Sequence, residues 1–280
     1  MVLTQTDCQF GLETPVAVVP PISVPEPVQD EAVETVDVWG LSLACLDTDG
    51  TLQRIDQMID RGYPGFFITA NLHYARLTAG SEYLQELNKR ASFITADGMP
   101  LVWQAQWQGQ PLPERVAGSD LVDLICKQAA LHGHRVFFLG GAEGVASETA
   151  RRLKEKYPLL PVAGVTAPAF REMTPEDHES LVADIRATRP DILFAALGQP
   201  KGEVWLDRHR EDLKIPVCVQ IGASLDFIAG QARRAPRWMR SCGLEWFHRM
   251  TTDPRRLAPR YLRDAMFLVK AVVAGPFRRR

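Results

Sequence analysis

The chain has few cysteines and no long apolar run. Five cysteines occur in 280 residues, with no Cys-x-x-Cys pair and no companion histidines at metal-ligand spacing. We therefore expect a reduced compartment and no structural zinc. No stretch reaches the roughly 20 apolar residues that span a bilayer, and the acidic, proline-containing N-terminus lacks the basic start and apolar core of a signal peptide. Export by that route is not expected.

Charge is unevenly distributed although the formal net charge is only -2. Residues 231–280 hold twelve arginines and one lysine against three carboxylates, a balance of +10, so the preceding residues carry -12. This pattern predicts a polyanionic ligand, an anionic membrane surface, or both. No recognised nucleic-acid motif accompanies the basic residues. Interleaved apolar side chains favour an interfacial helix, namely Trp238, Trp246, Phe247, Tyr261, Met266 and Phe267.

The order of apolar segments predicts the fold. Residues 1–35 are rich in proline, valine and acid and are interpreted as a disordered extension. Residues 36–230 then alternate short apolar runs with helical patterns, including one helix over 72–88 and a single strand before Asp47. This predicts an α/β core with a Rossmann-like, mostly parallel sheet and helices on both faces, followed by a basic helical C-terminal appendage over 231–280.

The stretch LACLDTDGTL, residues 43–52, contains two aspartates one residue apart. It is similar to the first motif of haloacid dehalogenase phosphatases, but no strand is followed by the acidic pair that would complete their Mg²⁺ site. It also looks like the Asp-x-Asp of metal-dependent glycosyltransferases, which place several βα units before the motif. We interpret Asp47, Asp49 or Thr51 as a helix cap. The phosphatase remains a distant third hypothesis.

Loops at the carboxyl ends of the predicted strands are the expected ligand site. Asp97 lies between an apolar strand and a glycine, where its carboxylate is either a general base or an Asx-turn. The glycine-rich turn after residue 139 is suited to a phosphate or nucleotide but is also compatible with a simple tight turn. Lys201 is a ligand contact or a solvated turn charge. Tail arginines are suited to neutralising a leaving diphosphate in place of Mg²⁺.

A series of short motifs occurs in order over residues 36–265. The motifs are Thr69-x-Asn71, Ala96-Asp97-Gly98, Arg115-x-x-Gly118-x-Asp120, FFLGG with Gly144-Val145-Ala146, LGxPKxE, Asp226-Phe-x-Ala-Gly230, Arg234-Ala-Pro236, Glu245-Trp246-x-x-Arg249 and Pro254-Arg255. The series resembles the WecG/TagA/CpsF family. The resemblance implies an inverting glycosyltransferase that moves a sugar from a UDP-sugar to a polyprenol-diphosphate-linked saccharide. It further implies a cytoplasmic protein, peripheral on the inner face of the membrane, that uses neither metal nor cofactor.

The resemblance also implies roles for individual residues. Asp97 matches the general base and Thr69 a residue that contacts substrate. The expected substrate-binding residues are Asn71, Gly140, Gly141, Gly144, Gly198, Gln199, Lys201, Glu203, Asp226, Arg234, Arg249 and Arg255. Gly202 and Ala223 depart from the family pattern and would favour a non-catalytic module that binds UDP-sugars or lipid saccharides. The donor sugar, whether N-acetylmannosamine, its uronic acid, glucuronic acid or glucose, stays open, as do the acceptor and any homo-oligomer.

Overall fold

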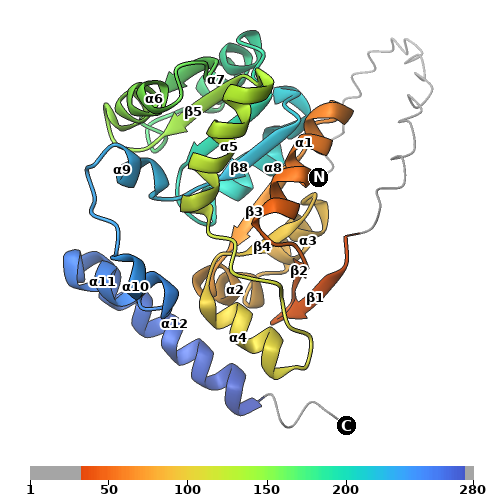
Figure 1. Ribbon diagram of the computed structural model, residues 1–280, viewed down its shortest axis with the longest axis vertical. Helices are drawn as coiled ribbons and strands as arrows, with labels where there is room; N and C mark the ends of the chain where they lie inside the picture. Colours follow the sequence, from red (N-terminus) through yellow and green to blue (C-terminus); the bar gives the residue numbers. More distant parts are fainter. Residues whose placement is uncertain (1–32, 275–280) are drawn as a thin grey trace, which may run out of the picture. The chain divides into compact units, whose positions relative to one another are not determined.

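The computed structural model describes residues 33–274, and most of the predicted N-terminal extension lies outside this range. Six parallel strands form one sheet in the order β4-β3-β8-β7-β5-β6 (Figure 1). This confirms the Rossmann-like α/β prediction. The strands are β3 (Phe66–Ala70), β4 (Ile94–Ala96), β5 (Val136–Gly140), β6 (Val162–Thr166), β7 (Ile192–Ala196) and β8 (Val217–Gln220).

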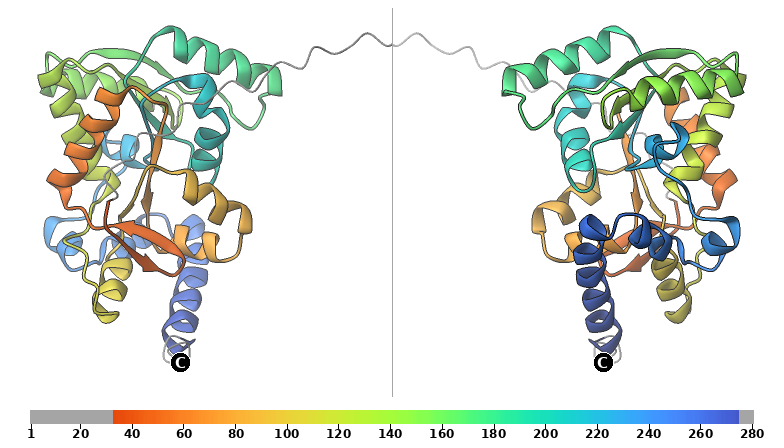
Figure 2. Two further views of the ribbon diagram at one scale, coloured as in Figure 1. Left: turned by 90° about the vertical axis from the view of Figure 1, so that its right-hand side faces the viewer. Right: turned by 90° about the vertical axis from the view of Figure 1, so that its left-hand side faces the viewer.

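Helices cover both faces of the sheet because side chains alternate along each strand. In β3, Phe66 packs into one core layer and Phe67 into the other, where it stacks on Phe93 with 4.7 Å between ring centroids. Figure 2 shows α1 and α5 on one side of the sheet and α3 and α8 on the other. The helices of the core are α1 (Thr48–Arg61), α2 (Leu72–Ala79), α3 (Glu82–Arg90), α4 (Met99–Trp107), α5 (Gly118–His132), α6 (Val145–Lys156), α7 (Pro175–Ala187), α8 (Lys201–Leu213) and α9 (Ser224–Ile228).

Two strands, not one, precede Asp47. β1 (Thr35–Val38) and β2 (Leu41–Ala44) form an antiparallel hairpin. Trp39 and Gly40 connect them with φ angles of 55° and 81°, the left-handed pair typical of a two-residue hairpin turn. The prediction of a single strand was wrong because the turn carries tryptophan where asparagine or aspartate would have marked it.

The single helix predicted over 72–88 is divided into two helices in the structure. α2 ends before Gly80, and the Ser81 hydroxyl accepts a hydrogen bond from the Leu84 N–H at 3.3 Å as the N-cap of α3. The glycine and the serine cap interrupt an apolar period that is continuous in the sequence. The capping interpretation of residues 43–52 is confirmed, since the Asp47 carboxylate accepts the Gly50 N–H at 2.7 Å at the start of α1.

The C-terminal appendage consists of α10 (Arg237–Ser241), α11 (Glu245–Thr252) and α12 (Pro254–Ala274). α12 packs on α2 through Asp264, which is buried and accepts a hydrogen bond from Arg76 Nε at 2.7 Å. His73 Nδ1 lies 3.2 Å from the same carboxylate, and Phe267 meets Trp39 edge to face. Among the helices of residues 33–274, none combines the length and apolar character needed to cross a bilayer.

Candidate active site

Asp97 stands at the carboxyl end of β4, half-buried, with its N–H donating to Ala70 O at 2.7 Å. The Gly118 N–H, at the start of α5, donates to its carboxylate. Burial raises the pKa of Asp97 to about 7 and Glu245 adds to the rise, while the Arg115 and Arg249 guanidiniums and the Gly118 N–H oppose it. A carboxylate with such a pKa exchanges protons readily at neutral pH.

The loops after β3 and β7 are tied together beside Asp97. Asn71 caps α2 by accepting the Tyr74 N–H at 3.1 Å, and its amide donates to Gln199 Oε1 at 2.9 Å. The Gln199 amide in turn donates to Thr69 O at 3.1 Å. Asn71 also borders the Asp97 loop, because a Cβ on Gly98 would lie 3.5 Å from Asn71 Cα. The structure thus brings Asn71 and Gln199 together with Asp97, as expected for one site.

Thr69 is more deeply placed than a substrate contact would suggest. The residue is 4% exposed, and its hydroxyl donates to Gln220 O at 3.3 Å. A Cβ on Gly118 would lie 3.1 Å from Thr69 Oγ1, so the missing side chain lets α5 approach β3 closely. Thr69 therefore supports the helix start that contacts Asp97.

The glycine-rich turn after β5 lies at the same edge of the sheet. Gly140 has φ of 91°, and a Cβ there would meet Leu197 Cδ2 at 2.8 Å and Ala196 O at 3.0 Å. Only glycine allows this approach of the β5 and β7 ends. Gly141 and Gly144 are exposed with positive φ, and Gly198 and Lys201 are exposed in the next loop. The start of α6 is accordingly open to a ligand.

Three further residues predicted to bind substrate lie in helices and not in the loops beside Asp97. Glu203 is only 1% exposed in the first turn of α8, and burial raises its pKa to about 8. It is buried beneath the loop, where the missing contact with water disfavours the charged form of the carboxyl. Asp226 lies in α9, half-buried, and Arg255 is exposed at the start of α12.

A chain of ion pairs joins the C-terminal appendage to the core next to Asp97. The Arg234 guanidinium donates two hydrogen bonds to the Asp120 carboxylate of α5, at 2.6 and 2.8 Å. Glu245 of α11 pairs with Arg115 at 3.3 Å and lies 3.9 Å from Arg234. Burial alone would raise the pKa of Asp120, but the Arg234 hydrogen bonds and charge hold it below its usual range. Arg234 is therefore engaged with protein carboxylates.

Among Arg234, Arg249 and Arg255, the tail arginines predicted to contact a ligand, Arg249 is the best placed. It acts electrostatically on Asp97, and its guanidinium lies 5.6 Å from the centroid of the Phe227 ring. A cation held over an aromatic face keeps its planar fork oriented. Of the arginines predicted to contact a diphosphate, the geometry favours Arg249.

Several residues of the site had no role in the sequence prediction. The recognised motifs contain Arg115, Asp120 and Glu245. The opposite charges of these residues were the signal that could have indicated their ion pairs. Nothing in the pattern indicates Gln220, whose side chain is buried and accepts the Leu197 N–H at 3.2 Å. Arg115 and its partner Glu245 are 130 residues apart in the chain, and such a separation leaves no local periodicity to detect.

Gly202 packs closely against the buried side chain of Gln220. A Cβ at this position would lie 2.7 Å from Gln220 Cδ. Gly202→Gln should therefore lower the free energy of unfolding by about 1–3 kcal/mol through overpacking, measured by urea denaturation. Adding Gln220→Ala should recover part of the loss. Wild-type stability in the single variant would show that the two positions do not compete for space.

Sequence comparison relates the chain to a family of known proteins. The model of the glycosyl transferase WecG/TagA/CpsF family matches residues 36–280. A Bacillus spizizenii protein named N-acetylglucosaminyldiphosphoundecaprenol N-acetyl-beta-D-mannosaminyltransferase is 31% identical over 198 residues, covering 71% of this chain and 75% of the relative. A Staphylococcus aureus protein of the same name is 30% identical over 192 residues, covering 69% and 74%. The chain therefore belongs to the WecG/TagA/CpsF family of glycosyltransferases.

Proposed function

We propose that this protein transfers N-acetylmannosamine from its UDP derivative to a polyprenol-diphosphate-linked N-acetylglucosamine, with inversion at the anomeric carbon. The names of the two relatives support the sugar and the acceptor. The family resemblance supports the UDP donor. The observation that carries the proposal is the half-buried Asp97, with a pKa of about 7, among Arg115, Glu245 and Arg249 at a strand end.

In the proposed reaction Asp97 accepts the proton of the attacking acceptor hydroxyl. The acceptor oxygen forms a bond to the anomeric carbon as the bond from that carbon to the diphosphate oxygen breaks. UDP leaves with the electron pair, and its new negative charge is stabilised by Arg249. The cationic side chains of Arg115 and Arg249 beside Asp97 support a mechanism that needs no metal ion. Thr69 and Gln199 act as positioning residues through the loops that they hold.

The appendage supports binding at an anionic membrane surface. One face of α12 exposes Leu262, Met266, Val269 and Val273, and each side chain is more than half exposed. Arg263 and Lys270 are exposed on the same helix. Tyr261 and Phe267, predicted for this face, instead contact Trp246 and Trp39. An apolar stripe beside basic side chains suits a helix lying in the headgroup region on the cytoplasmic side.

A donor screen tests the proposed function. UDP-linked N-acetylmannosamine, its uronic acid, glucuronic acid and glucose are each incubated with the protein and undecaprenyl-diphosphate-N-acetylglucosamine in vesicles. We expect a lipid product heavier by one N-acetylhexosamine with the first donor. Transfer from another donor would correct the sugar, and UDP-sugar binding without any product would favour the binding-module alternative.

The rate of transfer should depend on pH through Asp97. A base must be deprotonated to accept the proton, so kcat/KM should fall about tenfold per pH unit below about pH 7 and level off above it. Initial rates across this range, with saturating donor and with acceptor well below its KM, measure the profile. A profile that stays flat down to about pH 5 would assign the proton to another acceptor.

A further inference from the structure

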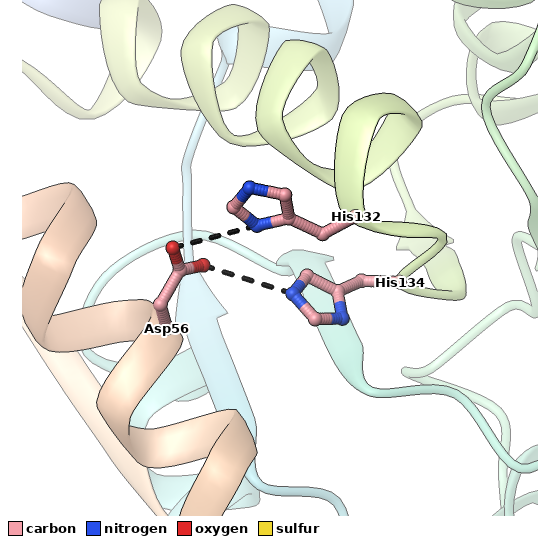
Figure 3. A group of neighbouring side chains, drawn as sticks. All are labelled: Asp56, His132 and His134. Atoms are coloured by element: carbon pink, nitrogen blue, oxygen red, sulfur yellow. Dashed lines mark ion pairs between the residues drawn. The ribbon is translucent and has the colours of Figure 1, made fainter.

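A group of three side chains lies near the amino end of β5, whereas Asp97 stands at the carboxyl end of β4. Asp56 comes from α1, His132 is the last residue of α5, and His134 precedes β5 (Figure 3). His132 Nδ1 lies 3.5 Å from Asp56 Oδ2, and His134 Nε2 lies 3.7 Å from Asp56 Oδ1. Because the strands are parallel, the amino end of β5 is remote from the carboxyl ends that form the candidate active site.

We propose that Asp56, His132 and His134 bind a divalent transition metal such as Zn²⁺. Two imidazoles and a carboxylate are the ligand types that these ions prefer, and three protein ligands leave a position for water. Ligand atoms about 2.1 Å from a tetrahedral ion are about 3.4 Å apart. The three atoms here lie within 4.8 Å of one another, so small side-chain rotations complete the geometry.

The distances favour a metal over simple ion pairs. A protonated imidazole beside a carboxylate would form a hydrogen bond near about 2.8 Å, whereas the contacts here are 3.5 and 3.7 Å. Asp56 Oδ1 is buried and accepts no hydrogen bond among the described residues. The Asp56 carboxylate thus presents one oxygen to each imidazole, and Oδ1 is available to an ion between them.

The local fold holds the three ligands in place. Gly133, with φ of 79°, ends α5 and turns the chain so that the two histidine rings meet edge to face at 5.5 Å. The Gln128 amide donates to Asp56 Oδ2, which orients the carboxylate. His132 is about half exposed and His134 mostly buried, so an ion has access from solvent. Bound metal would link α1 to the turn between α5 and β5.

Titration of the untagged full-length protein with ZnCl₂ by calorimetry tests the proposal. One ion should bind per chain, and Co²⁺ at the same site should give the visible absorption of a low-coordinate complex. His134→Gln and Asp56→Asn should each weaken Zn²⁺ binding by at least about tenfold. His209→Gln, which removes a half-buried histidine from the His178–His209 pair, is the matched control and should bind as the wild type does.

Thermal unfolding gives a second measurement on the same variants. Saturating Zn²⁺ should raise the Tm of the wild type and of His209→Gln by several degrees, without raising that of Asp56→Asn. Absence of binding at about 100-fold the protein concentration would overturn the proposal. So would unchanged affinity in both ligand variants. Neither readout uses transfer activity, so failure here leaves the proposed reaction untouched.

Discussion

Asp97→Asn should lower kcat by about 10²–10⁴-fold while UDP binds as in the wild type. Asparagine has nearly the same shape and can still accept the Gly118 N–H, but it takes no proton from a hydroxyl at neutral pH. The loss should therefore appear in the chemical step. Transfer to the lipid acceptor and calorimetric titration with UDP measure the two quantities separately.

The matched control is Asp47→Asn. Asp47 caps α1, and asparagine caps helices about as well as aspartate, so transfer should be unchanged. Full activity in the Asp97 variant would remove this carboxylate from the mechanism. Equal losses in both variants would indicate a general defect of folding.

Asp97→Asn should raise the stability of the folded protein although it lowers the activity. The pKa of Asp97 in the folded chain, about 7, lies above the ordinary value of 3.8. The folded state therefore binds more protons than the unfolded state between these values, and stability falls as pH rises through the window. Asp97→Asn removes this dependence. At pH above 7 the inactive variant should have a higher Tm than the wild type, as expected for a residue kept for function.

Arg249→Ala should lower kcat by about 10²–10³-fold, the size of effect seen when one group that stabilises developing charge is removed. Its guanidinium lies over Phe227 and acts on Asp97 across the candidate site. Arg249→Lys keeps the charge without the planar fork and should recover only part of the rate. Steady-state kinetics with the lipid acceptor measure both variants.

Arg263→Ala is the control for the loss of one tail charge. Arg263 is exposed on α12, and its Nε donates to Pro259 O within the same helix. Its removal should leave kcat near the wild-type value and weaken vesicle binding slightly, by about 1 kcal/mol at most. Similar losses in kcat for both arginines would mean that total tail charge, not the position of Arg249, supports the reaction.

Much of the fold was predictable because its signals are local. The alternating apolar runs correspond to the six parallel strands, and the helix cap at Asp47 follows from residues within one turn. The hairpin turn at Trp39 and Gly40 and the break at Gly80 were missed, since a four-residue strand and a single cap produce weak patterns. The expectation of no structural zinc rested on the spacing of the cysteines and on the lack of companion histidines, which says nothing about an aspartate in α1 beside two histidines that precede β5.

The sequence by itself determined the α/β layering, the strand-end position of Asp97 and the basic character of the tail. It did so because periodicity, capping and composition depend on neighbours in the chain. Only the tertiary structure decided the chemistry of those groups. The pKa of Asp97 depends on burial and on charges from α11 and the segment before α5, the space at Gly202 depends on β8, and the freedom of Arg234 is limited by Asp120. Electrostatic and packing energies depend on distances in space, which the order of residues does not contain.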